Sequence, residues 1–312
     1  MRISVEKTAE MLKEANSVVI TAHINPDGDA LGSCLGLMHI MESLGKKAQV
    51  LIDDDFSPNF KVLPGYERVH KPEAESYEAD YLVLLDASLD RCGRVAEKCK
   101  APVINIDHHV SNDEKAGYLC LDAKAAACAE LLYRIAKTME VRFTLEMAAN
   151  LYTGIVTDTG YFRYSNTTPY TMRAAAELLD TGLKPEVFSQ ALETRSFAHM
   201  KGMAAAMQTM EISDDGKVAG VYLDYELLSQ MESTEGFIDL VRVIEGVDVT
   251  LLMKAVEPDV CRVSMRSRYT DVSRIAISLG GGGHIRAAGC TINKPFAEAK
   301  EIVLKAIREA LV

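Results

Sequence analysis

The heptapeptide His23-Ile24-Asn25-Pro26-Asp27-Gly28-Asp29 joins an apolar run, residues 18–22, to a long segment with helical periodicity. The run predicts a buried β-strand and the following segment predicts a helix. The heptapeptide therefore lies at the carboxyl end of a strand, which is the edge of an open α/β sheet where ligands bind. Its imidazole and carboxylates suit Mn²⁺ or Mg²⁺. Because an Asp at this place can also simply cap the helix, the metal interpretation requires partners elsewhere in the chain.

The composition is that of a globular protein with two domains: 312 residues, of which 48% are hydrophobic and 25% charged. No apolar run approaches the ~20 residues of a membrane helix, and no signal peptide precedes the first strand, so we expect a cytoplasmic protein without a membrane partner. Seven cysteines without a C-x-x-C pair disfavour disulfides and structural zinc, and we expect buried thiols such as Cys34 and Cys128. The net charge of −11 disfavours binding to long nucleic acid and favours a small anionic ligand.

Strands and helices alternate through the first half of the chain, which predicts right-handed βαβ units around a parallel sheet. A further helix is expected after Thr168, with Pro169 at its first position and Gly182 beyond its end. The expected strands are residues 18–22, 48–52, 81–85 and 102–106, and the expected helices are residues 5–16, 31–44, 95–99, 123–138 and 144–156.

The pattern changes after residue 210. Residues 185–210 predict one continuous helix, whereas the turn residues 213–216 and 257–259, each between apolar runs, predict two hairpins. Helices are expected at residues 236–244, 271–279 and 296–310. We therefore expect an α/β fold with a parallel-sheet domain over residues 1–190, a linker helix over residues 191–213, and a smaller mixed α+β domain over residues 214–312.

Acidic or histidine residues lie at or just after the carboxyl ends of four predicted elements in the first half of the chain. Since the carboxyl ends of parallel strands share one edge, these side chains can converge there. Each alone has a structural explanation, such as a helix cap or a buried histidine, but four coincidences at one edge favour a metal site. The side chains are His23, Asp27 and Asp29; Asp86; Asp107, His108 and His109; and Asp158.

Charge matching favours two metal ions. Asp27, Asp29, Asp86 and Asp158 carry four negative charges, which equal those of two divalent cations. Without cations, these carboxylates would repel one another and raise each other's pKa values. Two metal ions held close together can activate water and neutralise the charge of a displacement at phosphorus.

Two neighbouring residues fit supporting roles. Asp107 is better placed as a hydrogen-bond partner of a ligating histidine than as a ligand. His109 is a candidate to contact the phosphate or to protonate a leaving group. The acidic run at residues 53–55 is expected to be solvated surface and to take no part in the site.

The four motifs resemble those of the DHH phosphoesterase superfamily. Residues 280–289, with the sequence Gly-Gly-Gly-Gly-His-x-x-Ala-Ala-Gly, resemble the signature of the DHHA1 domain. The chain length and residues 157–167 resemble the branch of this family with oligoribonuclease and pAp phosphatase activity. The resemblance covers nearly the whole chain and implies a DHH catalytic domain followed by a DHHA1 substrate-binding domain.

The resemblance also implies a ligand set, in which Asp86 bridges two ions. One ion would be held by His23, Asp27 and Asp86. The other would be held by Asp29, Asp86, His108 and Asp158. Two Mn²⁺ are implied as cofactors, with Mg²⁺ or another divalent cation as the alternative, and the family resemblance favours a homodimer.

The glycine-rich segment is the main candidate for substrate binding. It lacks the Gly-Lys-Ser/Thr of a Walker loop, so it is either a flexible turn or a place where the backbone approaches an anion. The resemblance adds a second segment around Arg266, which can hold a phosphate bidentately and whose structural alternative is a surface ion pair. The candidate substrate-binding residues are Ser264, Arg266, Gly282, Gly283, His284 and Arg91.

The residues predict a metal-dependent phosphohydrolase, and the resemblance implies that it cleaves short 5′-phosphorylated oligonucleotides to mononucleotides, with removal of the 3′-phosphate of pAp as a second activity. The nearest alternative is a phosphodiesterase for cyclic di-AMP or its linear product pApA. A family II inorganic pyrophosphatase shares the four motifs but not the segment 280–289, and an exonuclease for long strands would carry further domains. A nucleotide-binding sensor without catalysis is the alternative of another class, although it would have little use for a complete set of metal ligands.

Overall fold

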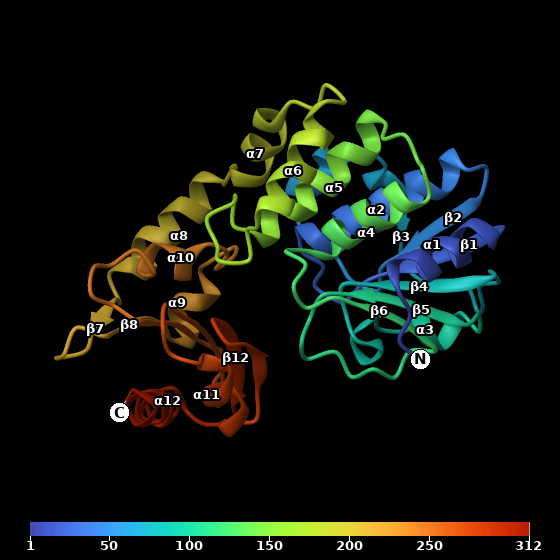
Figure 1. Cartoon of the computed structure of the whole chain (residues 1–312). Coiled ribbons are helices and arrows are strands. Elements are labelled where there is room, and N and C mark those ends of the chain that lie inside the picture. Colours follow the sequence, from blue (N-terminus) through green and yellow to red (C-terminus); the bar gives the residue numbers. More distant parts are fainter. Residues whose placement is uncertain (312) are drawn as a thin grey trace. The chain divides into compact units, whose positions relative to one another are not determined.

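The computed structural model describes residues 1–311 and divides into two compact units, which meet in the sequence between Thr194 and Arg195. Each unit has its own six-stranded sheet (Figure 1). The predicted α/β fold, a parallel sheet followed by a mixed sheet, is confirmed. Among the helices of residues 1–311, none combines the length and the apolar character needed to span a bilayer.

The first sheet is parallel throughout, and its strand order is β3-β2-β1-β4-β5-β6. This order reverses direction between β1 and β4, so a topological switch point, where open α/β sheets bind ligands, lies between their carboxyl ends. The strands are β1 (Ser17–Thr21), β2 (Lys47–Leu51), β3 (Val69–His70), β4 (Tyr81–Leu85), β5 (Val103–Asp107) and β6 (Tyr118–Leu121).

Helices cover both faces of this sheet because its strands carry apolar residues on both sides. On β1, Val18 and Ile20 face the larger core, to which α1, α2, α4, α5 and α6 contribute, whereas Val19 faces α3 on the other side (Figure 1). The helices of this unit are α1 (Val5–Glu14), α2 (Gly28–Ser43), α3 (Val95–Lys98), α4 (Cys128–Thr138), α5 (Leu145–Asp158), α6 (Pro169–Leu179) and α7 (Pro185–Glu193), with 3₁₀ helices η1 (Pro58–Val62), η2 (Tyr66–Arg68) and η3 (Leu89–Arg91).

Helices α2 and α5 pack closely against each other through glycines. A Cβ atom on Gly32 would lie 2.4 Å from the carbonyl oxygen of Asn150. A Cβ atom on Gly154 would lie 2.6 Å from Oδ1 of Asp29. These positions therefore exclude larger side chains, and the close approach brings the start of α2 beside the end of α5.

The second sheet has the order β11-β12-β10-β9-β8-β7, in which only β8 and β9 are parallel. One face packs against α11 and α12, and on the other face α8 and α10 cover β8 and β9. The elements are α8 (Phe197–Met207), β7 (Glu211–Ile212), β8 (Val218–Leu223), α9 (Tyr225–Ser229), α10 (Phe237–Val241), β9 (Val249–Glu257), β10 (Val260–Ser267), α11 (Val272–Ser278), β11 (Gly282–His284), β12 (Ala287–Ile292) and α12 (Phe296–Ala310).

Most predicted elements are confirmed to within a few residues, including the hairpins β7–β8 and β9–β10 and the capping of α6 by Thr168. All seven cysteines are buried and unpaired, which includes the buried thiols expected at Cys34 and Cys128. The prediction of a single helix over residues 185–210 is wrong. This segment is divided into α7 and α8, because Thr194 is extended and the hydroxyl of Ser196 starts a new helix by accepting the N–H of His199. The domain limits at residues 190 and 213 stay predictions.

Candidate metal centre

The predicted metal ligands converge at the switch point of the first sheet. His23, Asp27 and Asp86 offer one ligand atom each, all within 4.8 Å of one another, and so do Asp29, His108 and Asp158. These residues come from the end of β1, the start of α2, the turns after β4 and β5, and the last turn of α5. Asp86 also groups with His108 and His109 in the same way, so its carboxylate is shared.

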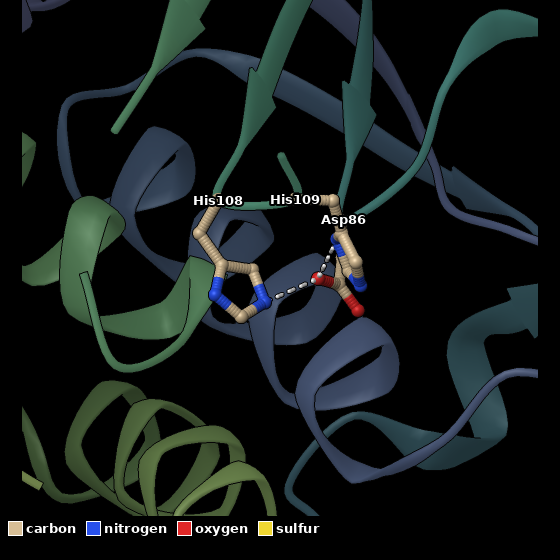
Figure 2. Close-up of side chains that lie close together, drawn as sticks. All are labelled: Asp86, His108 and His109. Carbon is tan, nitrogen blue, oxygen red and sulfur yellow. Dashed lines mark ion pairs between the residues drawn. The ribbon is translucent and has the colours of Figure 1, made fainter. Parts of the chain in front are cut away.

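Asp86 lies at the centre of this arrangement and is only 2% exposed. Its Oδ1 is buried and accepts no hydrogen bond, although Nε2 of His108 lies 3.3 Å away and Nδ1 of His109 3.5 Å away (Figure 2). Its Oδ2 lies 3.6 Å from Nε2 of His23. A buried carboxylate oxygen without a partner is costly, and a cation between these groups would satisfy it. The donor set of carboxylates and imidazoles therefore fits a divalent metal ion.

The backbone of Asp86 adopts the left-handed conformation, with φ 59°. Non-glycine residues rarely do so, and the strain concentrates at functional sites. The N–H of Asp86 donates to the carbonyl of Ile106 on β5, so the turn after β4 is tied to the neighbouring strand. This turn directs the carboxylate of Asp86 toward the histidines that follow β5.

The heptapeptide caps α2 as predicted, and its geometry also fits the predicted metal-binding role. Nδ1 of His23 donates to the carbonyl of Ile24 (2.8 Å), which leaves Nε2 as the ligand atom. Oδ1 of Asp27 caps α2 by accepting the N–H groups of Asp29 and Ala30, both at 3.0 Å. The side chain of Asp27 is 61% exposed, so capping occupies one oxygen and leaves the other accessible. Capping and metal binding are therefore not alternatives here.

The acidic run at residues 53–55 is not simply solvated surface, which corrects the prediction. Asp53 is half-buried beside Arg94, with which it forms a charged hydrogen-bond pair. Oδ2 of Asp54 accepts the N–H of Asn25 at 2.9 Å, and Asn25 has φ 53°. The run therefore fixes the conformation of the heptapeptide from outside the metal centre.

Asp29 is held by the start of α4. Its Oδ2 accepts the N–H of Cys128 at 2.6 Å, and its Oδ1 accepts the N–H of Ala129 at 2.9 Å and the hydroxyl of Ser33 at 3.1 Å. The positive end of a helix dipole stabilises a carboxylate in this position. Burial, together with the charges of Asp86 and Asp158, nevertheless raises the pKa of Asp29 well above its ordinary value.

The imidazole of His108 lies between Asp29, Asp86 and Asp158. Its Nδ1 donates to the carbonyl of Ala125 (3.3 Å), and its Nε2 lies 3.5 Å from Oδ2 of Asp158 and 3.9 Å from Oδ2 of Asp29. Burial opposes the charged imidazole, but the neighbouring carboxylates raise the pKa of His108 to about 10. Burial raises the pKa of Asp158 to about 7. These raised pKa values favour the protonated forms of His108 and Asp158, and a metal ion bound at these groups would displace the protons.

Asp107 and His109 lie beside the ligands. Asp107 is fully buried, and its Oδ1 accepts the N–H groups of His108 (2.7 Å) and His109 (3.1 Å) and Nδ1–H of His109 (2.7 Å). Its Oδ2 accepts Nδ2 of Asn112 at 2.6 Å. With both oxygens engaged, Asp107 orients the imidazole of His109 and fixes the backbone of His108 and His109.

Sequence reasoning missed three asparagines at this centre. Asn166 donates to the carbonyls of Asp158 (3.0 Å) and Ala126 (2.9 Å) and so fixes the end of α5. Asn105 and Asn112 bond to each other between the turns that carry Asp86 and His109. The available signal was Asn105 itself, a polar residue inside the apolar strand at residues 102–106.

The candidate substrate-binding residues of the second unit lie on three adjacent strands. Ser264 on β10 pairs with Gly289 on β12, which pairs with Gly282 on β11. In the same way, Arg266 and His284 pair with opposite sides of Ala287. The side chain of His284 lies outside the described part of the chain. Nη1 of Arg266 donates to the carbonyl of Met265 at 3.0 Å.

The glycine-rich segment is not a flexible turn, because residues 282–284 form β11. Gly283 has φ 137°, and a Cβ atom there would lie 2.6 Å from the carbonyl oxygen of Ala287 on β12. Gly281 is equally confined by β12, whereas Gly282 has open space around it. Arg91 belongs to the first unit: its side chain is exposed, and its carbonyl accepts the N–H of Ile24 in the heptapeptide.

Comparisons with known proteins agree with these features. The model of the DHH family, N-terminal domain, matches residues 17–155, and that of the DHHA1 domain matches residues 215–312. A Thermus thermophilus protein named bifunctional oligoribonuclease and PAP phosphatase NrnA is 36% identical over 97% of this chain and 93% of its own.

Two further proteins are similar over nearly their whole length. The Bacillus subtilis protein of the same name is 26% identical, with 89% of this chain and 90% of that protein covered. The crystal structure of an exopolyphosphatase-related protein from Bacteroides fragilis has a TM-score of 0.88 at 25% identity, with 98% of this chain and 95% of that chain covered. The resemblance seen in the motifs is thus confirmed, and the chain belongs to the DHH family, with a DHHA1 domain in its second half.

Proposed function

We propose that this protein is a Mn²⁺-dependent phosphohydrolase that cleaves short 5′-phosphorylated oligonucleotides to mononucleotides, with removal of the 3′-phosphate of pAp as a second activity. One observation carries the proposal: Asp86 belongs to one group of ligand atoms, and its buried Oδ1, which accepts no hydrogen bond, lies 3.3 Å from Nε2 of His108 in the other group. The names of the Thermus and Bacillus relatives support the substrate class.

The ligand atoms support a division between two cations. His23, Asp27 and Asp86 would hold one ion, and Asp29, His108 and Asp158 would hold the other, with Asp86 contributing to both. When bound, such ions would polarise the phosphoryl group, activate water and neutralise developing negative charge. The oxygen-rich set with imidazoles favours Mn²⁺, with Mg²⁺ as the alternative.

The protein's own side chains would orient these groups and the substrate. Asp107 accepts Nδ1–H of His109, so Nε2 of that imidazole would contact the phosphate or donate a proton to the leaving oxygen. In the second unit, Arg266 would bind a phosphate, together with Ser264, Gly282, Gly283 and His284, and Arg91 is a further candidate in the first unit. The net charge of −11 supports a short substrate, since a long strand requires many phosphate contacts.

The decisive experiment compares pApA, a 5-mer, a 24-mer, pAp and cyclic di-AMP in parallel with Mn²⁺. We expect the fastest hydrolysis with pApA and the 5-mer, and release of phosphate from pAp. Fastest turnover of cyclic di-AMP would favour the cyclic dinucleotide phosphodiesterase. Fastest turnover of the 24-mer would contradict the short-substrate proposal, and binding without any turnover would favour the nucleotide sensor.

Two further expectations belong to the same proposal, the first from the sequence pattern and the second from the family resemblance. The protein would act in the cytoplasm as a homodimer. Sedimentation velocity of the purified protein tests the dimer, and a monomer at micromolar concentration that retains full activity would contradict it.

A further inference from the structure

A pair of asparagines connects the two turns that carry the bridging carboxylate and the histidines. Asn105 lies on β5 and is 1% exposed. Its Nδ2 donates to the carbonyls of Leu84 (3.1 Å) and Ala87 (2.9 Å). These two carbonyls flank Asp86 in the sequence, so one amide group spans the left-handed turn at that residue.

Asn112 continues the connection from the loop after β5. Its Nδ2 donates to Oδ1 of Asn105 at 2.8 Å and to Oδ2 of Asp107 at 2.6 Å. Its Oδ1 accepts the N–H of Glu114 at 2.9 Å. A continuous chain of hydrogen bonds therefore runs from the turn at Asp86 through both amides to Asp107, and from there to His109.

The direction of each amide is fixed by its partners. Nδ2 of Asn105 faces two backbone carbonyls, which can only accept hydrogen bonds. Nδ2 of Asn112 faces a carboxylate oxygen and an amide oxygen, while its Oδ1 faces a backbone N–H. A flipped side chain would lose these bonds at either position, so the network has one arrangement.

Burial of the Asn105 amide costs free energy, and the packing of the core does not explain why a polar residue stands there. Asn105 occupies a buried position between Ile104 and Ile106 on a strand whose neighbour β4 is apolar throughout. A buried amide is tolerated only when its hydrogen bonds are satisfied, and an apolar residue would fill such a position without that requirement. Both amides direct their donors toward the metal-bearing turns, and these turns must keep a fixed spacing for Asp86 to contact two ligand groups.

We propose that Asn105 and Asn112 are positioning residues that lock the turn at Asp86 to Asp107 and thereby set the geometry of the metal ligands. Neither amide touches the ligand atoms themselves. Asn105 holds the strained backbone on both sides of Asp86, and Asn112 holds Asp107, which orients His108 and His109. The proposal concerns the ligand set of the proposed function, and binding of Mn²⁺ tests it without any substrate.

Asn112→Asp is the sharpest variant because it is isosteric. Either carboxylate oxygen can still accept the N–H of Glu114, but the other would face Oδ2 of Asp107 and Oδ1 of Asn105, where a donor is needed. Asn112→Ala removes the donor without adding repulsion. Ser111→Ala is the matched control, since Ser111 is exposed in the same loop and makes no side-chain hydrogen bond within residues 1–311.

Isothermal titration of each metal-free variant with MnCl₂ gives the number and affinity of sites, and thermal melting of the same metal-free samples gives their stability. For Asn112→Asp, we expect weaker Mn²⁺ binding at one or both sites and a lower kcat with pApA, each by about 10- to 100-fold, with KM unchanged. Asn112→Ala should show a smaller loss in the same direction, and Ser111→Ala none.

Wild-type Mn²⁺ affinity in Asn112→Asp would overturn the proposal, even if the metal-free variant melted at a lower temperature, because the asparagines would then be merely structural. If Asn112→Asp does not fold, Asn112→Ala decides by the same two titration readouts. If the titrations agree with the proposal but pApA is not cleaved by the wild-type protein, the proposed substrate class is wrong and the positioning role stands.

Discussion

The ligand edge of the first sheet and the β10–β12–β11 strands of the second differ in how they hold their polar groups. At the first, the acids and histidines are concentrated and buried, with Asp29 1%, Asp86 2% and His23 6% exposed. At the second, Ser264 and Arg266 are half-buried and take their positions from antiparallel pairing. In the first region Oδ1 of Asp86 is buried without a hydrogen bond, whereas the second region is formed by strand pairing. If the first region carries the chemistry and the second binds the substrate, as proposed, variants of the two regions should have separable effects.

The largest effect is expected from Asp86→Ala, which removes the carboxylate that is proposed to contribute to both metal ions. Loss of both cations forfeits about 4 kcal/mol or more of transition-state stabilisation, so kcat/KM should fall at least about 10³-fold. Metal content measured on the purified variant should fall with it. Asp90→Ala is the control, since Asp90 is an exposed acid four residues later. Retained activity in Asp86→Ala would contradict the shared-ligand model.

Arg266→Ala should affect the second region alone. A charge-assisted hydrogen bond to a phosphate contributes about 1.5–3 kcal/mol, so KM for pApA should rise by about 10- to 100-fold. Mn²⁺ affinity measured by titration should stay at the wild-type value. Arg262→Ala is the matched control, because Arg262 is an exposed residue with the same side-chain direction four positions earlier on β10. Weaker Mn²⁺ binding in Arg266→Ala would show that the two regions are not separable.

The pH dependence of Mn²⁺ binding should distinguish the first region in a different way. The pKa of His108 is raised to about 10 and that of Asp158 to about 7, so at pH 8 His108 carries a proton that a cation must displace. Affinity should therefore rise with pH below about 10, by about tenfold per pH unit for each proton released. Below pH 7, Asp158 is protonated as well, so metal binding should release a further proton, and Asp29, whose pKa is also raised, adds to this count.

Titration calorimetry at pH 8 in buffers of different ionisation enthalpy counts these protons directly. His70→Gln, which changes an exposed histidine at the end of β3, should leave the count unchanged. An Mn²⁺ affinity that stays constant between pH 6 and pH 9 would mean that His108 is already neutral in the metal-free protein.

The two regions also differ in how far the sequence could predict them. The ligand edge was predictable because apolar runs mark the strands, and the residue after each run must lie at the same edge. The left-handed turn at Asp86 was not, since nothing in residues 81–87 requires it; the amide of Asn105 and the strand β5 impose it. Asn112 could not be assigned a role, because its partners depend on how the loop after β5 folds.

In the second unit, local sequence patterns predicted less of the structure than in the first. The strand β11 has only three residues, two of them glycine, so neither alternation nor β-propensity marks it. Its existence depends on the partner strand β12. The break between α7 and α8 is also set by a local cap at Ser196. Helical periodicity on both sides of Ser196 favoured one continuous helix, so the cap was not predicted. These features arise from tertiary or capping interactions that outweigh the periodic signal.

A pair of glycine variants gives the smallest effect and separates strand pairing from ligand binding in the second region. Gly283 has φ 137°, and in Gly283→Ala the new methyl group would meet the backbone of β12. The free energy of unfolding should therefore fall by about 1–3 kcal/mol, which a lower melting temperature would show. In Gly282→Ala, the methyl group enters open space and the backbone has a φ that alanine can adopt, so the melting temperature should hardly change.

The informative quantity is then KM for pApA in Gly282→Ala. If KM rises while stability and Mn²⁺ affinity are unchanged, the absent Cβ makes room for the substrate; an unchanged KM would mean that the glycines serve only the pairing of β11 with β12.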